Sequence, residues 1–341
     1  MGKGERQLLA TPPVNRYGEG PVSAYATEVV LSGQKDPNEK FGVVILGGAN
    51  AGAGAAGATE AAQRLGVIKA ADAIYGISGG AFAAVYAATG QSSEAIKIYY
   101  RYLNTSRFYN PGRLLGSMMS PLAPPAVDVK YITDEVMRHE VPLDIAALSQ
   151  SPIPIYGGAI DAITGDSIDF NLVELAGQTS GQHKVGDALR AGATLPIAGG
   201  RAMRLNRRHL YDRGVKDSPT ALDQAIEDGC TRILILDNDV DPGRLPRIYR
   251  VGARLIRDEH PIVADMLNHW YDKFQEVARR KRERAINPLD NPTPGNPNIE
   301  VVSPGVAVSM FEKNEAKLRG AADAGGKAFT RHFPRLAQAY A

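Results

Sequence analysis

The stretch Gly76-Ile77-Ser78-Gly79-Gly80 decides the fold of this chain. It follows an apolar run at residues 71–75 and precedes residues 81–86, which are mostly small. This order predicts a strand, a sharp turn that carries Ser78, and a helix. The flanking glycines permit a tight bend and leave room where strand and helix cross. Because the serine hydroxyl would lie at a helix N-terminus, the pattern predicts a nucleophile.

The composition is that of an ordinary globular protein. Of the 341 residues, 44% are apolar and 22% are charged, so the chain can bury a large core. The net charge of +2 is too small to suggest a nucleic-acid partner. The single cysteine, Cys230, excludes an internal disulfide and suits a reducing compartment.

Targeting signals are not recognised in the sequence. Residues 1–6 lack the apolar core of a signal peptide, and Arg6 stands where a myristoylation site needs Ser or Thr. The longest run of low charge, residues 41–58, is mostly Gly and Ala with Asn50 in its middle, which makes a poor membrane span. We therefore expect a soluble, cytoplasmic protein, and export by a route without a signal peptide stays open.

Short apolar runs alternate with helical segments along the chain. Strands are expected at residues 42–46, 72–76, 153–160, 167–170, 231–236 and 299–302. A helix that begins in the Gly/Ala segment is expected to continue over residues 59–65. Further helices are expected at residues 80–89 and 93–103 and from about residue 306 onward. This alternation predicts an α/β fold with a doubly wound, largely parallel sheet and helices on both faces.

The chain is expected to form one domain after an N-terminal arm. Residues 1–40 are polar and contain Gly and Pro, as an arm would, and the domain then covers residues 41–341. Within the domain, a helical segment is expected at about 243–297, before the terminal strand and helix. Residues 111–129, with Met118 and Met119, are interpreted either as a mobile apolar loop or as an ordinary surface connection.

A glycine-rich loop follows the first predicted strand, at residues 47–57. Its residues 52–57 match the dinucleotide pattern G-x-G-x-x-G, but the acidic Asp72 precedes the second strand instead of ending it. A second interpretation gives the glycines a role in helix–strand packing alone. In the third, the backbone N–H groups of residues 47–49 stabilise a developing oxyanion, and the elbow about thirty residues downstream strengthens this interpretation.

A third motif lies downstream, where the small-residue segment 191–196 precedes Tyr211-Asp212-Arg213-Gly214. In this order, the glycine-rich loop, the G-x-S-x-G elbow and the aspartate turn resemble the motifs of the patatin-like phospholipase family. The resemblance runs from about residue 41 to residue 237. It implies a patatin-like α/β hydrolase fold, a Ser–Asp dyad without histidine, and hydrolysis of lipid acyl esters with no metal or other cofactor.

The resemblance assigns roles to five residues. Ser78 matches the nucleophile and Asp212 the base that activates it. Gly47, Gly48 and Ala49 match the loop that binds the oxyanion. The implied substrate is a lipid acyl ester of the phospholipid class, which implies contact with a membrane surface and leaves the oligomeric state open.

Three positions depart from the family pattern. Ala49 replaces a glycine, and Ala51 stands where the family has Arg or Lys. Arg213 replaces a glycine after the aspartate, where a left-handed backbone would cost about 1 kcal/mol. Its guanidinium would also lower the pKa of Asp212 and weaken it as a base. A second hypothesis is therefore a catalytically weakened protein that binds lipid or a partner.

Other residues compete for the catalytic roles. Ser78 has an alternative role as the cap of the following helix, and Asp212 as a turn aspartate. Asp217 and Asp237 are the alternative bases.

A Ser–Asp–His order would place the histidine at His260 or His269, although neither lies in a short loop after a strand.

Basic residues crowd the approach to the aspartate turn. We hypothesise that some of them attract phospholipid headgroups or an anionic membrane. The alternative is that they are solvated charges on a hairpin. They are Arg201, Arg204, Arg207, Arg208, His209 and Arg213.

Overall fold

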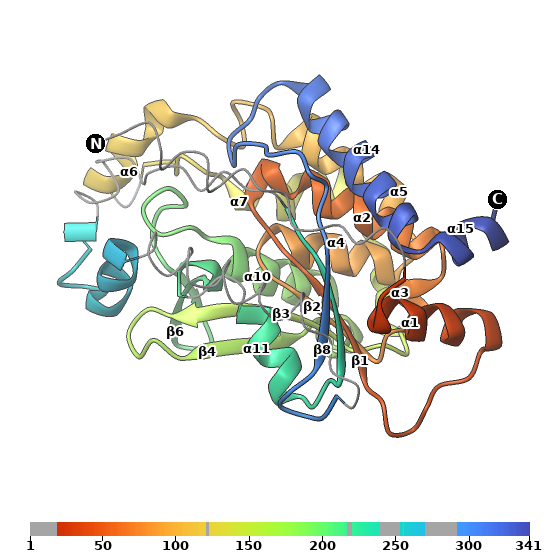
Figure 1. Cartoon of the computed structure of the whole chain (residues 1–341). Coiled ribbons are helices and arrows are strands. Elements are labelled where there is room, and N and C mark those ends of the chain that lie inside the picture. The colour runs from red at the N-terminus through yellow and green to blue at the C-terminus, as the bar shows by residue number, and fades with distance from the viewer. Residues whose placement is uncertain (1–18, 121–122, 217–219, 239–252, 255, 270–291) are drawn as a thin grey trace, which may run out of the picture.

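A mixed sheet lies at the centre of the molecule (Figure 1). The computed structural model describes residues 19–120, 123–216, 220–238, 253–254, 256–269 and 292–341. Among these residues, eight strands pair in the order β5-β6-β3-β2-β1-β7-β8, with β4 also paired to β3. The strands are β1 (Phe41–Ile45), β2 (Ala73–Gly76), β3 (Ile155–Asp161), β4 (Ser167–Asn171), β5 (Met203–Leu205), β6 (Arg208–Asp212), β7 (Arg232–Leu236) and β8 (Asn298–Val302).

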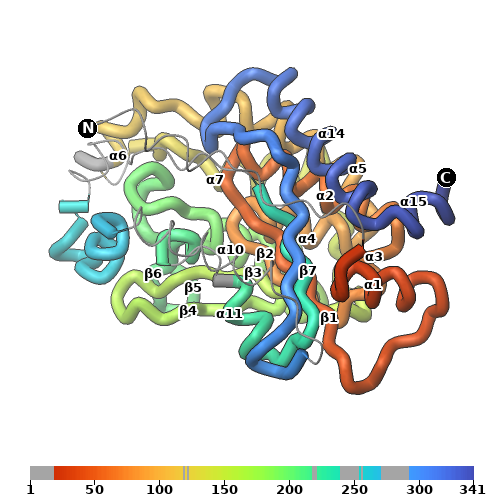
Figure 2. Tube along the Cα trace, viewed as in Figure 1, coloured from red at the N-terminus to blue at the C-terminus, as the bar shows by residue number. Residues whose placement is uncertain are grey.

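The strand directions confirm the predicted, largely parallel α/β sheet. β1 runs parallel to β2 and β7, β2 to β3, and β7 to β8. Figure 2 shows β7 and β8 side by side although more than sixty residues separate them in the sequence. The antiparallel pairs gather at one side of the sheet: β3 with β4, β3 with β6, and β5 with β6. The predicted hairpin of β3 and β4 is confirmed.

Helices cover both faces of the sheet, as predicted. On β1, Val43 and Ile45 contact the larger core, whereas Val44 contacts a smaller core on the opposite face. In Figure 1, α2, α4 and α14 lie above the sheet and α11 lies below it. The helices are α1 (Pro21–Ser32), α2 (Ala53–Arg64), α3 (Val67–Ala70), α4 (Gly79–Ala88), α5 (Ser92–Lys97), α6 (Leu114–Met119), α7 (Val129–Tyr131), α8 (Ile145–Ser149), α9 (Leu172–Gly177), α10 (Gly181–Ala193), α11 (Thr220–Glu227), α14 (Glu315–His332) and α15 (Pro334–Ala339).

The region expected to be an N-terminal arm contains the helix α1. Val22 and Val29 of this helix are buried in the larger core. Glu300 of β8 accepts hydrogen bonds from the amides of Val22 and Ser23, at 2.8 and 3.1 Å. A carboxylate at the first turn of a helix satisfies its free N–H groups, so this contact fixes α1 to the sheet.

Two glycines of the glycine-rich run lie inside α2 and not in a phosphate-binding loop. A Cβ atom at Gly57 would lie 1.9 Å from the carbonyl oxygen of Ala322 in α14. A Cβ atom at Gly325 of α14 would lie 1.9 Å from the carbonyl oxygen of Gly54. Because the two helices approach this closely, the structure gives Gly54 and Gly57 the packing role.

The strand arrangement brings the elbow and the aspartate turn together. β4 pairs with residues 156–160 of β3, so β2 and β6 share the opposite edge of that strand. β2 runs parallel to β3 and ends beside Gly157, whereas β6 runs antiparallel and ends beside Ala159. The carboxyl ends of β2 and β6 therefore point toward each other, and Ser78 and Asp212 lie at those ends.

Several predicted features fall wholly or partly outside the described residues. These include Asp217, most of the predicted helical segment at 243–297, and the side chains of Met118 and Met119. The backbone of residues 111–119 forms a short 3₁₀ turn followed by α6. Among the helices that the structure describes, none has the length and apolar character needed to cross a bilayer.

Candidate active site

Ser78 occupies a strained turn between β2 and α4. Its φ of 50° and ψ of −125° lie in a region that residues other than glycine rarely adopt. A Cβ atom at Gly76 would lie 2.3 Å from the Cα of Ala81, and one at Gly80 would lie 2.1 Å from the carbonyl oxygen of Ile45. The predicted elbow is confirmed. The Ser78 side chain makes no capping hydrogen bond, so the capping interpretation is not supported.

Asp212 lies at the end of β6 with only 2% of its surface exposed. Its Oδ1 accepts a hydrogen bond from the amide of Gly214 at 2.8 Å, and its own amide donates to the carbonyl of Thr194 at 2.8 Å. Burial raises the pKa of Asp212 from its ordinary value of 3.8 to about 6, although the polar influence of the Ser78 hydroxyl lowers the pKa. A carboxyl group with this pKa is ionised at neutral pH yet still accepts a proton readily.

Arg213 has one of the two effects that the sequence predicts for it. Its backbone starts a short right-handed 3₁₀ turn (Arg213–Val215), so no left-handed strain arises. Its side chain is 4% exposed, lies against Gly158 and pairs with Asp169 at 2.5 Å. The guanidinium lowers the pKa of Asp212, as predicted, but burial outweighs this effect, so the net shift of that pKa is upward.

Asn238 orients the loop that follows β1. It is 6% exposed, and its Nδ2 donates to the carbonyl oxygens of Leu46 and Gly47 at 2.8 and 3.0 Å. Its Oδ1 accepts a hydrogen bond from the amide of Ala55 at 2.7 Å. In a trans peptide unit the C=O and N–H bonds point in opposite directions. Since both carbonyls point toward Asn238, the N–H groups of Gly47 and Gly48 point away from it.

The same loop contacts Ser78. A Cβ atom at Gly47 would lie 2.7 Å from the Cβ of Ser78, so only glycine fits there. Gly48 and Ala49 have positive φ values of 153° and 48°. Within the described residues, the amides of Gly47, Gly48 and Ala49 donate no hydrogen bond. The loop therefore holds three unpaired donors next to the serine.

An apolar pocket opens at Ser78. The Tyr99 hydroxyl donates to the carbonyl of Gly79 at 2.7 Å, so its polar group is satisfied and its ring contributes to the wall. Such a surface suits a hydrocarbon chain. The pocket is lined by Ala49, Ser78, Gly79, Phe82, Ile98, Tyr99, Leu103, Phe108, Val127, Val129, Ile132, Ala193, Leu195 and Met310.

Other candidate residues from the sequence lie elsewhere. His260 packs against the rings of His209 and Tyr211, and His269 is exposed beside Asp265. No histidine is found among the described residues that line the apolar pocket. Asp237 accepts a hydrogen bond from the amide of its neighbour Asn238.

Sequence reasoning missed Asn238 and the Arg213–Asp169 pair. Asn238 had a usable signal, because it follows a buried strand at the carboxyl edge of the sheet, where site residues of α/β folds gather. The pairing of Arg213 with a residue 44 positions upstream had none.

Comparison with known families places these features in context. The family model described as patatin-like phospholipase matches residues 43–226, which is 184 of the 341 residues. The chain belongs to the patatin-like phospholipase family. This family consists of hydrolases of lipid esters, and the matched segment contains Ser78, Asp212 and residues 47–49. Asn238 lies beyond it. No curated protein matched the chain.

Proposed function

We propose that this member of the patatin-like phospholipase family cleaves fatty acyl esters of phospholipids through a Ser78–Asp212 dyad. The observation that carries the proposal is that Ser78, in a strained elbow, and the buried Asp212 carboxyl group, with a pKa of about 6, lie at the facing ends of β2 and β6. The loop beside them holds three amides that donate no hydrogen bond within the described residues. Nucleophile, base and oxyanion donors are the parts that acyl transfer requires. The apolar pocket offers a place for the acyl chain.

In the first half-reaction, Asp212 accepts the proton of the Ser78 hydroxyl as Oγ attacks the ester carbonyl carbon. The carbonyl electron pair moves to oxygen, and the N–H groups of Gly47, Gly48 and Ala49 stabilise the resulting oxyanion. When the tetrahedral species collapses, the bond to the leaving alcohol breaks and Asp212 returns the proton to that oxygen. An acyl-Ser78 ester remains.

In the second half-reaction, Asp212 takes a proton from a water molecule that attacks the acyl-Ser78 carbonyl. The same amides stabilise the second oxyanion. Its collapse releases the fatty acid, and Ser78 Oγ regains the proton from Asp212. Asn238 acts in both steps as a positioning residue, because it holds the loop amides in place.

The alternative hypothesis, a catalytically weakened lipid-binding protein, is less well supported. It depended on Arg213 and on the missing charge at Ala51. Arg213 leaves the pKa of Asp212 at about 6, a value suited to a base. Ala51 is buried in the larger core, so this position contributes apolar packing instead of the family's charge.

Product analysis tests the proposal. Mixed phospholipid vesicles incubated with the wild-type protein should release free fatty acid and lysophospholipid, measured by mass spectrometry. Ser78→Ala should release neither above background, because it removes the nucleophile and keeps the Cβ atom. If the wild type binds the vesicles but releases no fatty acid, the non-catalytic hypothesis is supported instead.

A further inference from the structure

A cavity of about 410 Å³, lined by both charged and apolar residues, lies beside the apolar pocket. Val127 and Val129 line both spaces. Thr194 also lines the cavity, while its two sequence neighbours line the apolar pocket. The carbonyl of Thr194 accepts the amide hydrogen of Asp212, so Thr194 connects the cavity directly to the proposed catalytic site.

The cavity, which we call the basic cavity, is lined by more cations than carboxylates. Among the described residues that line the cavity, the charged ones are Lys130, Arg190, Arg201, Arg204 and Asp128. Within the part of the chain that the structure describes, neither Arg201 nor Arg204 forms an ion pair. Asp128 accepts a hydrogen bond from the amide of Tyr131, where it caps α7. No described carboxylate therefore competes with an anion for these two guanidinium groups.

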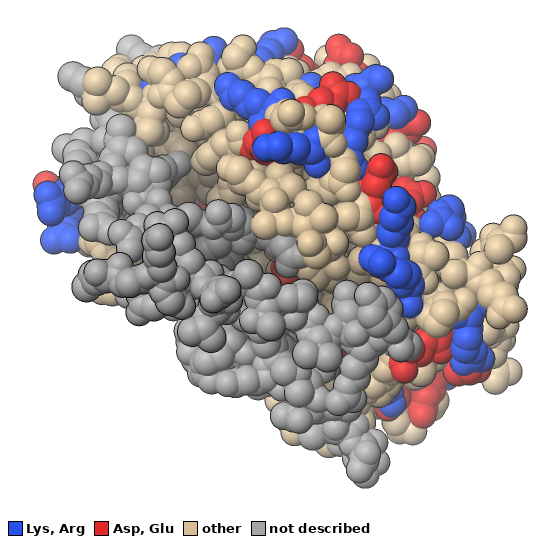
Figure 3. Space-filling view, turned by 45° about the horizontal axis from the view of Figure 1, so that its top comes forward, with Lys and Arg blue, Asp and Glu red and all other residues tan. Residues whose placement is uncertain are grey.

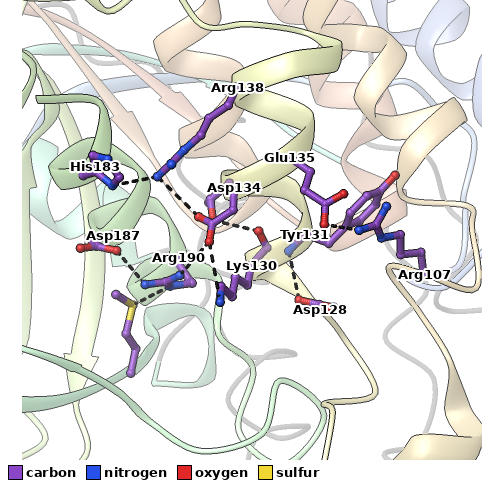
Figure 4. A network of polar contacts seen from close by, with 12 residues as sticks. Arg107, Asp128, Lys130, Tyr131, Asp134, Glu135, Arg138, His183, Asp187 and Arg190 are labelled. Atoms are coloured by element: carbon purple, nitrogen blue, oxygen red, sulfur yellow. Dashed lines mark hydrogen bonds and ion pairs between the residues drawn. The ribbon is translucent and has the colours of Figure 1, made fainter. Parts of the chain in front are cut away.

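Lys130 and Arg190 of the lining, with the neighbouring Arg138, are also incompletely neutralised (Figure 4). The carboxylate of Asp134 lies 4.0 Å from Lys130 and 3.8 Å from both Arg138 and Arg190. Asp187 adds one closer contact to Arg190, at 2.7 Å. Three cations that share two carboxylates leave one positive charge, which favours a phosphate group with several acceptor oxygens.

The rest of the lining indicates which headgroup fits. A quaternary ammonium group, as in choline, is recognised on aromatic faces. The described lining residues of the basic cavity include no aromatic ring. Over the described part of the face drawn in Figure 3, Lys and Arg are mixed with Asp and Glu, so that part offers no uniformly basic surface to an anionic membrane.

We propose that the basic cavity is a subsite for the anionic headgroup of the lipid substrate, with Arg201 and Arg204 as its specificity-determining residues. It selects lipids that carry a phosphate monoester over those that carry phosphocholine. This inference rests on the proposed function, because it assumes that the acyl chain enters the apolar pocket at Ser78.

Short-chain lipids test the selection without a membrane surface. Dihexanoyl phosphatidic acid, dihexanoyl phosphatidylcholine and uncharged dihexanoyl glycerol are compared as monomers. For the wild type, kcat/KM should be at least tenfold higher for phosphatidic acid than for phosphatidylcholine. The double variant Arg201→Gln/Arg204→Gln should lose this preference; a tenfold preference corresponds to about 1.4 kcal/mol of headgroup contact. The variant should keep its kcat/KM for the uncharged ester within about twofold of the wild type, because that ester has no headgroup charge.

Arg207→Gln is the matched control, since Arg207 is an exposed residue of the same hairpin that does not line the cavity. It should keep the full preference. The proposal is overturned if the wild type shows no preference, or if the control loses it as completely as the double variant.

A binding experiment separates failure of this proposal from failure of the proposed function. By titration calorimetry, Ser78→Ala should bind dihexanoyl phosphatidic acid at least tenfold more tightly than inorganic phosphate, and should lose that affinity when both arginines are replaced. Equal affinity for inorganic phosphate would indicate a free-anion site and overturn the headgroup subsite. If the wild type hydrolyses none of the esters, the proposed function fails and this binding result alone decides the proposal.

Discussion

Asp212→Asn is expected to lower kcat/KM by roughly 10³- to 10⁴-fold and, at the same time, to stabilise the protein at neutral pH. The asparagine Oδ1 can still accept the hydrogen bond from the amide of Gly214, so the turn should persist. The amide cannot accept the proton of Ser78, so the attack on the ester loses its base. Activity and stability therefore change in opposite directions.

The sign of the stability change follows from the pKa of Asp212. Burial raises that pKa from 3.8 to about 6, so the folded state binds the proton more tightly than the unfolded state. The corresponding stability is fully present below about pH 4 and is lost as the pH rises through 6. The full shift corresponds to about 3 kcal/mol. We expect Asp212→Asn to recover about 1–3 kcal/mol at pH 8 and nothing near pH 4.

Urea unfolding at pH 4 and pH 8, with hydrolysis assays on the same samples, measures both effects. Asp166→Asn is the control, because Asp166 is an exposed carboxylate in the turn between β3 and β4. It should change neither quantity. If Asp212→Asn keeps wild-type activity, Asp212 is not the base.

Asn238→Ala is expected to lower kcat by about 10²- to 10³-fold with KM within about threefold of the wild type. The substitution removes the donor that holds the carbonyls of Leu46 and Gly47, so the N–H groups of Gly47 and Gly48 lose their fixed direction. The apolar pocket is untouched, which is why ground-state binding should change little. Steady-state kinetics on a soluble ester measures the split between kcat and KM.

Two further variants distinguish positioning from general destabilisation. Asn238→Asp keeps an acceptor for the amide of Ala55 but replaces the donor, so it should be as defective as Asn238→Ala. Leu336→Ala removes a fully buried side chain in α15 at a cost of about 2–5 kcal/mol and should leave kcat unchanged below its unfolding temperature. Wild-type kcat in Asn238→Asp would contradict the positioning role.

The local parts of this molecule could be predicted because each depends on neighbours in the sequence. The elbow is one such part, since Gly76 is required by its close contact with Ala81, five positions further along the chain. The strands were recognisable as short apolar runs, and their parallel pairing followed from their alternation with helices. The roles of Ser78, Asp212 and residues 47–49 came from the resemblance to a family and stay proposals.

The long-range parts could not be predicted. The pKa of Asp212 depends on how completely the fold buries it, and the sequence shows only the adjacent arginine, whose effect has the opposite sign. The partner of Arg213 is Asp169, which β3 and β4 bring near through the sheet. Asn238 acts on peptide groups more than 190 positions upstream, a contact that only the pairing of β1 with β7 explains.

The central claim is that Asp212 activates Ser78, and the rate of phosphonylation by a fluorophosphonate as a function of pH tests it most directly. We predict a single adduct, located at Ser78 by peptide mass spectrometry. Its rate of formation should rise with pH through an apparent pKa of about 6, and Asp212→Asn should lose both the speed and this dependence. Labelling at another residue, or equally fast labelling of Ser78 in Asp212→Asn, would contradict the account.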